Sequence, residues 1–323
     1  MQPGPLPSRP DAPQPPQPVA GANPPSQRSV IGTREALLLT VLTLAWGLNW
    51  PVMKVSIGTI APLSFRTLSM WLGLPVLLAI ALALKVPLRV PRRHWRELAV
   101  LTLTNMLVWY VLMMVSLQSL SSGRAAILGY TMPIFSAVLG MGLYGQRLAT
   151  RQWAGVGAAA LGVGLLLWHE LGTMAGQPWA AIGMLVAAAT WALGTQQLRH
   201  TRLGLPTLTL VFWMTLATMA VMTAMAVVLE HDRWSAPAPV AWFGVIFNAV
   251  IIIGIAQPIW LILARSLPPI ASTLSVMLIP VLGTVAGAWW LGERLHWQDG
   301  AALGLILAAI GSVLWPARAP RQA

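Results

Sequence analysis

Cysteine is absent from this chain of 323 residues, and charged side chains make up only 9% of it. Without cysteine, the protein has no disulfide framework, no thiolate metal site and no cysteine nucleophile. Hydrophobic residues make up 57% of the sequence, and its mean hydropathy is +0.71. The sequence has too few polar residues to cover the surface of a water-soluble globule. We therefore expect a protein that is solvated largely by lipid.

The motifs of common catalytic sites are also missing. The chain contains no HExxH or GxSxG motif, no phosphate-binding glycine loop and no paired carboxylates within an apolar run. We therefore expect no enzymatic activity, no metal site and no cofactor. Asp, Glu and His are absent from the middle of every apolar run, so no buried proton relay is visible and the energy source stays open.

The chain does contain many apolar runs that are long enough to cross a membrane. A helix needs about 20 apolar residues to span a hydrocarbon layer roughly 30 Å thick. The sequence therefore predicts an all-α membrane protein with ten transmembrane helices, at residues 36–55, 64–84, 97–117, 123–144, 152–169, 179–198, 206–229, 240–264, 269–291 and 298–316. The proline-rich residues 1–33 predict a disordered cytoplasmic tail.

The formal net charge of +12 has a simpler explanation than nucleic-acid binding. Most of the 20 Lys and Arg residues fall in the tail and in alternate connections between apolar runs, as expected for segments that stay in the cytoplasm. We therefore expect both termini to face the cytoplasm of a bacterial cell, in a multi-pass protein of the inner membrane. The lipid bilayer is then the expected partner, nucleic acid is not, and the oligomeric state stays open.

An internal repeat divides the chain into two similar halves. A shift of 147 positions places Pro133 on Pro280, and it keeps further matches in register without a gap, including Gly145 on Gly292 and Trp168 on Trp315. A shared apolar composition alone rarely aligns Pro, Gly and Trp residues in one register. The sequence therefore predicts two repeats of five helices, at residues 34–172 and 173–317.

The odd number of helices in each repeat determines its orientation. A second copy of five helices enters the bilayer from the opposite face, so the two copies are related by a pseudo-two-fold axis in the membrane plane. Inverted repeats of this kind are typical of secondary transporters, because the two halves can exchange conformations of similar energy. The repeat therefore favours transport by alternating access.

Four segments carry a resemblance to a known family. They are WGLNWPVMK at 46–54, SSGRAAILGYTMPIFSAVLG at 121–140, LYGQRL at 143–148 and WLGERL at 290–295. Together they resemble the drug/metabolite transporter superfamily, EamA type, over essentially residues 34–317. The resemblance implies two five-helix bundles around a central cavity, and it implies export of amino acids or other metabolites. The chain departs from the usual pattern at Gln146, where an acid is common and where the second copy has Glu293.

Amides and aromatic residues within the apolar runs are the candidates for the wall of a substrate cavity. An unpaired amide in lipid costs free energy, so such amides should face the bundle interior, and indole or phenol rings offer faces to an apolar or cationic group. The candidates are Trp46, Asn49, Trp50, Asn105, Trp109, Tyr110, Tyr130, Trp191, Gln196, Asn248, Gln257 and Trp260. Hydrogen bonding between helices is the alternative role for each amide, and packing is the alternative for each ring.

Two further pairs of residues have a predicted role. Pro133 and Pro280 lie near the middle of two equivalent apolar runs, where each removes a backbone hydrogen bond, so we expect paired kinks that act as hinges. Lys54 and Arg66 lie near helix ends, where long side chains can extend toward the interface, with attraction of an anionic group as the alternative.

These features predict a secondary transporter that exports a small metabolite, such as an amino acid or another amphipathic solute. The alternative is an integral membrane scaffold that binds partners without transport, although the connections between apolar runs are short for that role. A channel is disfavoured because no charged ring or filter-like sequence repeats.

Overall fold

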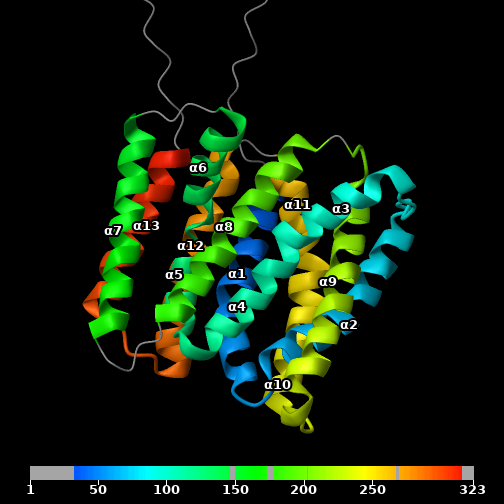
Figure 1. Ribbon diagram of the computed structural model, residues 1–323, viewed down its shortest axis with the longest axis horizontal. Coiled ribbons are helices and arrows are strands. Elements are labelled where there is room, and N and C mark those ends of the chain that lie inside the picture. Colours follow the sequence, from blue (N-terminus) through cyan, green and yellow to red (C-terminus); the bar gives the residue numbers. More distant parts are fainter. Residues whose placement is uncertain (1–32, 146–149, 173–177, 202, 267–268, 315–323) are drawn as a thin grey trace, which may run out of the picture. The chain divides into compact units, whose positions relative to one another are not determined.

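The computed structural model describes residues 33–145, 150–172, 178–201, 203–266 and 269–314, which contain helices and no strand (Figure 1). The α-helices are α1 (Thr33–Ile57), α2 (Pro62–Ala83), α3 (Trp95–Thr102), α4 (Val108–Ser119), α5 (Ser122–Gly129), α6 (Met132–Tyr144), α7 (Thr150–Gly172), α8 (Pro178–His200), α9 (Thr207–Glu230), α10 (Pro239–Phe247), α11 (Gln257–Ser266), α12 (Pro269–Leu291) and α13 (Trp297–Leu314). The proline-rich tail, apart from its last residue Thr33, and Gln146 lie outside the described residues.

Several of the helical segments are long and apolar enough to cross a membrane. Seven segments in the described part of the chain meet this criterion, and two shorter apolar helices cover Trp153–Leu166 and Leu278–Leu291. Many large apolar side chains on these helices are exposed, as lipid-facing residues would be. The chain is therefore an integral multi-pass membrane protein.

Helices that are distant in sequence pack against one another. The main contacts pair α1 with α12, α2 with α9, α4 with α8, and α7 with α13, and Figure 1 shows α7 beside α13. Small residues permit these approaches, because helix association in lipid depends on close packing rather than on the hydrophobic effect. A Cβ added at Gly47 in α1 would lie only 2.7 Å from the Cβ of Leu282 in α12.

Two of the apolar runs contain a π-helical segment that the sequence does not predict. The segment η2 (Leu103–Leu107) joins α3 to α4, and η4 (Asn248–Ala256) joins α10 to α11. Each segment contains one buried asparagine, Asn105 in η2 and Asn248 in η4. Such widened turns are common at functional sites, because they redirect the side chains that follow.

The run at 123–144 is not one continuous helix, as the sequence predicts, but is interrupted between α5 and α6. Pro133 has no N–H to donate to the carbonyl of Gly129, and Tyr130 and Thr131 form a turn. The Thr131 backbone N–H and hydroxyl both donate to the carbonyl of Leu128, at 3.1 and 2.6 Å. Pro133 therefore lies in the first turn of α6, whereas Pro280 lies inside the uninterrupted helix α12.

Two glycines that the repeat aligns adopt the same unusual backbone conformation. Gly145 follows α6 with a φ of 63°, and Gly292 follows α12 with a φ of 65°. Glycine is favoured there because a side chain is strained in the left-handed region. The two equivalent helices thus end in the same way.

Candidate functional site

A small, partly open cavity lies where several helices meet. Its volume is about 70 Å³, and its wall combines residues of α1, α2, α4, α6, α8, η4 and α11 with the turn between α5 and α6. Four residues of α1 contribute, namely Trp46, Asn49, Trp50 and Met53. Their spacing of three and four places them on one face of the helix, which is why one element supplies so much of the wall.

Most of the candidates selected from the sequence lie around this cavity. They are Trp46, Asn49, Trp50, Trp109, Tyr110, Tyr130, Trp191, Gln257 and Trp260. The sequence missed Met53, Arg66, Met113, Met132 and Ile252, which also line it. Methionines fill apolar gaps in any helix bundle, so their sequence positions carry no signal of a cavity.

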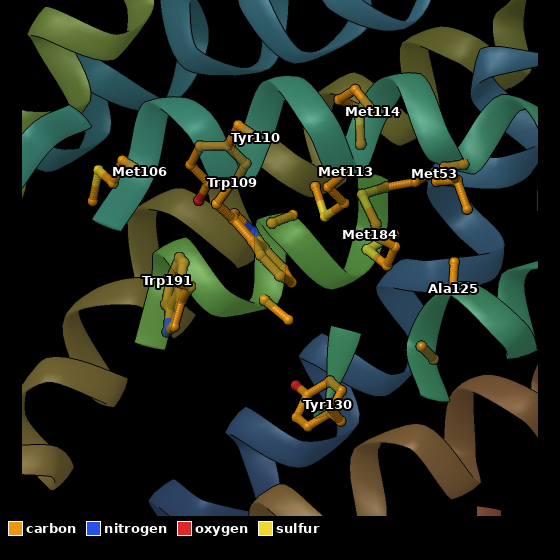
Figure 2. Close-up of a cluster of buried hydrophobic side chains, with 14 of the residues drawn as sticks. Met53, Met106, Trp109, Tyr110, Met113, Met114, Ala125, Tyr130, Met184 and Trp191 are labelled. Carbon is orange, nitrogen blue, oxygen red and sulfur yellow. The ribbon is translucent and has the colours of Figure 1, made fainter. Parts of the chain in front are cut away.

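Two pairs of tryptophans form part of the wall. The rings of Trp46 in α1 and Trp260 in α11 have centroids 5.4 Å apart, and those of Trp109 in α4 and Trp191 in α8 lie 5.2 Å apart at 60°. Figure 2 shows Trp109, Tyr110 and Trp191 with the neighbouring methionines. Each pair joins a helix of the first half to a helix of the second, so a change in either interface would reshape the cavity.

The remaining three candidates, all amides, lie away from the cavity wall and join helices to each other. Asn105 donates to the carbonyl of Trp191 and to the hydroxyl of Thr195, both at 3.3 Å. Gln196 donates to the carbonyl of Ser136 at 2.7 Å and to its hydroxyl at 3.0 Å. Both contacts are the interhelical hydrogen bonds that the sequence leaves as the alternative role.

The third of these amides, Asn248, accepts a hydrogen bond of 3.1 Å from the guanidinium of Arg66. The Arg66 side chain is only 1% exposed, so the prediction that it extends toward the membrane interface is wrong. Its guanidinium carbon lies 4.6 Å from the centroid of the Tyr110 ring. Arg66 is close to the start of α2, and sequence position alone does not reveal that it points into the bundle.

Lys54, at the end of α1, also has partners within the protein. Its ammonium donates to the carbonyls of Leu117 and Gln118, at 2.8 and 3.0 Å, in the last turn of α4. A cation is favoured there because the carbonyls at a helix C-terminus carry a partial negative charge. This contact ties the end of α1 to the end of α4.

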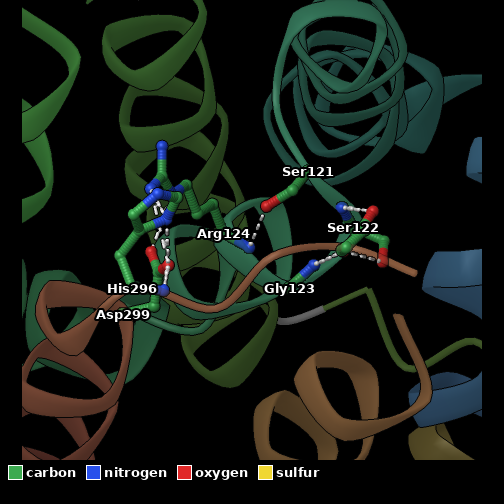
Figure 3. A network of polar contacts seen from close by, with 7 residues as sticks. Ser121, Ser122, Gly123, Arg124, His296 and Asp299 are labelled. Atoms are coloured by element: carbon green, nitrogen blue, oxygen red, sulfur yellow. Dashed lines mark hydrogen bonds and ion pairs between the residues drawn. The ribbon is translucent and has the colours of Figure 1, made fainter. Parts of the chain in front are cut away.

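A polar network joins α5 to the segment between α12 and α13 (Figure 3). The Glu293 carboxylate accepts hydrogen bonds from the backbone N–H of Ser122 at 2.7 Å and of Gly123 at 3.3 Å, and from the Ser122 hydroxyl at 2.9 Å. Arg124 pairs with Asp299 at 2.7 Å. We call these five residues the α5–α12 latch, because they hold the two halves together at one end of the bundle.

Glu230, at the end of α9, makes an equivalent contact with the start of α2. Its carboxylate accepts hydrogen bonds from the backbone N–H of Leu63 at 3.0 Å and of Ser64 at 2.7 Å, and from the Ser64 hydroxyl at 2.8 Å. Anions are favoured at a helix N-terminus, so this acid satisfies free N–H groups of α2. Glu230 and Glu293 therefore each connect one half of the chain to the other.

A model of the EamA-like transporter family matches the chain twice, at residues 33–168 and 178–315. The chain is 25% identical over 288 residues to an uncharacterized inner membrane transporter, YedA, of Escherichia coli strain K12, covering 87% of this chain and 92% of that protein. It is 25% identical over 276 residues to a probable amino-acid metabolite efflux pump of the same strain, covering 81% and 88%. A solved crystal structure shares the fold, with a TM-score of 0.64 and 21% identity over 86% of this chain and 96% of that one.

Proposed function

The chain belongs to the EamA-like transporter family, and on that premise we propose that it exports a small amphipathic metabolite, such as an amino acid, by alternating access. The observation that carries this proposal is the cavity whose wall combines indole rings, amides and one arginine from both halves. Such a wall suits a solute with an apolar part and a few polar groups. The name of one similar protein, an amino-acid metabolite efflux pump, agrees with this class of solute.

We propose that the fold consists of ten transmembrane helices in two inverted repeats, at 34–172 and 173–317. The two matches to the family model support this division. The helix contacts support it too, because exchanging the halves turns the α1–α12 contact into the α6–α8 contact, and both are present. The α2–α9 and α7–α13 contacts each map onto themselves.

We also propose that the cavity belongs to a state in which the end of the bundle at the α5–α12 latch is closed. Its volume of about 70 Å³ is well below the roughly 300 Å³ at which ligand pockets usually begin. A solute therefore enters only when the wall moves apart. The α5–α12 latch and the Glu230 contact close one end of the bundle, so both must open in the opposite state.

The orientation that we propose places both termini in the cytoplasm of a bacterium. Lys85, Arg89, Arg92, Arg93 and Arg96 lie together in and beside the connection between α2 and α3. Glu230 lies at the opposite end of α2, where it contacts the start of that helix. Glu293 and Asp299 contact the start of α5. Positive charge is favoured on the cytoplasmic side, so the latch faces outward.

Transport into proteoliposomes tests the proposal. The purified protein should take up labelled amino acids into vesicles preloaded with the same unlabelled amino acid, and the rate should saturate. Trp191→Ala should raise the half-saturating concentration several-fold, because it removes a wall of the cavity. Trp289→Ala is the matched control, since that ring is 89% exposed and should leave transport unchanged.

Two results would contradict the proposal. Flux that rises linearly with concentration would indicate a channel rather than a carrier. No flux of any metabolite through folded protein would favour the scaffold that binds partners without transport.

A further inference from the structure

Arg66 is a buried cation without a carboxylate partner in the described part of the chain. The ion pairs there involve Arg124, His231 and His296, and none includes Arg66. Its side chain is one of the largest that are fully buried. Burying a guanidinium without an anion costs free energy, so the buried position of this arginine indicates a function.

The groups around the guanidinium are neutral and satisfy it only in part. One terminal nitrogen donates to the Asn248 amide oxygen at 3.1 Å, and the other donates to the Met53 sulfur at 3.0 Å, which is a weak acceptor. The Nε nitrogen has no hydrogen-bond partner among the described residues. Arginine presents a planar fork of donors that matches a carboxylate, so the unused capacity fits an anion from outside the protein.

Asn49 supplies a second polar group beside Arg66 in the same cavity. Its amide nitrogen donates to the same Met53 sulfur at 3.4 Å, so the two side chains lie within the length of one small solute. The Asn49 amide oxygen accepts no hydrogen bond from the described residues. A free acceptor beside the faces of Trp46 and Trp50 suits an ammonium group, which carbonyl oxygens and indole rings both attract.

We propose that Arg66 is the carboxylate anchor of the cavity and that the solute is a zwitterionic α-amino acid with an apolar side chain. This proposal rests on the transport function proposed above. The carboxylate lies on the Arg66 fork, the ammonium lies against Asn49 and the neighbouring indoles, and the apolar side chain packs on the tryptophans and methionines. Arg66 thereby gains the counter-ion that the protein does not supply.

A ligand series on the wild-type protein tests the anchor without any mutation. Leucine, leucinamide, 3-methylbutylamine and 4-methyl-2-oxopentanoate share one apolar group and differ in whether they carry the carboxylate and the ammonium. Inhibition of labelled leucine counterflow should follow the order leucine, then the oxo acid, then the two compounds that lack a carboxylate. The loss on removing the carboxylate should be about 10- to 100-fold, the value of a charge-assisted hydrogen-bond pair.

Substitution of Arg66 should remove this discrimination. Arg66→Gln should weaken leucine inhibition by the same factor and leave leucinamide inhibition unchanged, and Arg66→Lys should fall between the wild type and Arg66→Gln. Arg233→Gln is the matched control, because that arginine is exposed and lies outside the cavity. Thermal melting verifies that each variant is folded. If Arg66→Gln does not fold, the ligand series on the wild-type protein still tests the carboxylate anchor.

Three outcomes would overturn the anchor. They are equal inhibition by leucine and leucinamide, equal weakening of both ligands by Arg66→Gln, and saturable transport of other solutes with no carboxylate among them. The last would leave the transport function intact. Absence of all saturable flux would overturn both proposals together.

Discussion

Single carboxylates at helix starts hold the two halves of the chain together. Glu230 bonds to two backbone N–H groups and a hydroxyl at the start of α2, and it is only 4% exposed. Glu293 does the same at the start of α5. The sequence reveals that these acids avoid the middle of the spans, but it does not reveal which helix start each one reaches.

Glu230→Gln should lower the free energy of unfolding by about 1–2 kcal/mol. The substitution removes the negative charge and replaces one acceptor oxygen with an NH₂ group, which then faces the N–H donors of α2. Thermal melting in detergent measures the loss. Asp232→Asn is the control, since the Asp232 side chain is 86% exposed and pairs with the neighbouring His231. Equal melting temperatures for the wild type and Glu230→Gln would contradict this role.

The aromatic part of the cavity could be predicted from the sequence, whereas its charged part could not. Trp46, Asn49 and Trp50 repeat with helical spacing inside an apolar run, so a common face follows from geometry. The direction of Arg66 depends on which neighbours α2 meets, and no local pattern encodes that. The same reasoning predicts that Asn105 and Gln196 line the cavity beside Asn49, whereas the packing directs both amides into hydrogen bonds between helices.

At the level of the helices, close approach between two helical segments depends on glycine. A Cβ at Gly194 in α8 would lie 2.5 Å from the Cβ of Asn105 and 2.7 Å from its backbone nitrogen in η2. The π-helical turn thus lies directly against α8. Sequence periodicity describes one helix at a time, so it predicts neither this approach nor the widened turn.

Gly194→Ala should therefore destabilise the protein by about 1–3 kcal/mol through steric overlap. Gly164→Ala in α7 is the control, because no atom of the described residues lies within 4 Å of the added Cβ. That change should be neutral, or stabilising by up to about 1 kcal/mol, since alanine favours helix. In one detergent, the melting temperature should fall for Gly194→Ala and should stay level or rise for Gly164→Ala. A matching fall in both variants would contradict the steric explanation.

The two prolines affect different kinds of element, although the repeat aligns them. Pro133→Ala should restore the missing backbone N–H and extend α6 toward α5, and Pro280→Ala should restore a backbone hydrogen bond inside α12. Both changes should reduce the transport rate several-fold, because they alter bending rather than hydrophobicity. Transport assays alongside quantification of inserted protein make the comparison, and loss of insertion in step with transport would refute the hinge role.

For the whole molecule, the repeat in the sequence and the contacts in the structure agree in their symmetry. The matching φ angles of Gly145 and Gly292 and the exchangeable helix contacts both follow from two similar halves. The presence of helices long and apolar enough to cross a membrane could be predicted from composition. The interruption at Pro133 and the inward direction of Arg66 could not, because both depend on how the halves meet.

We expect the two halves to separate at the α5–α12 latch during each transport cycle. A Cβ at Gly123 in α5 would lie 3.1 Å from the Cα of Thr284 in α12, so cysteines at these two positions are close enough to form a disulfide. The chain has no other cysteine, so these would be its only thiols.

The most direct measurement is amino-acid counterflow by the Gly123→Cys, Thr284→Cys double variant before and after oxidation, with each single variant as control. The account predicts that the disulfide stops counterflow in proportion to the fraction cross-linked and that reduction restores it. Undiminished counterflow by fully cross-linked protein would contradict alternating access through this interface.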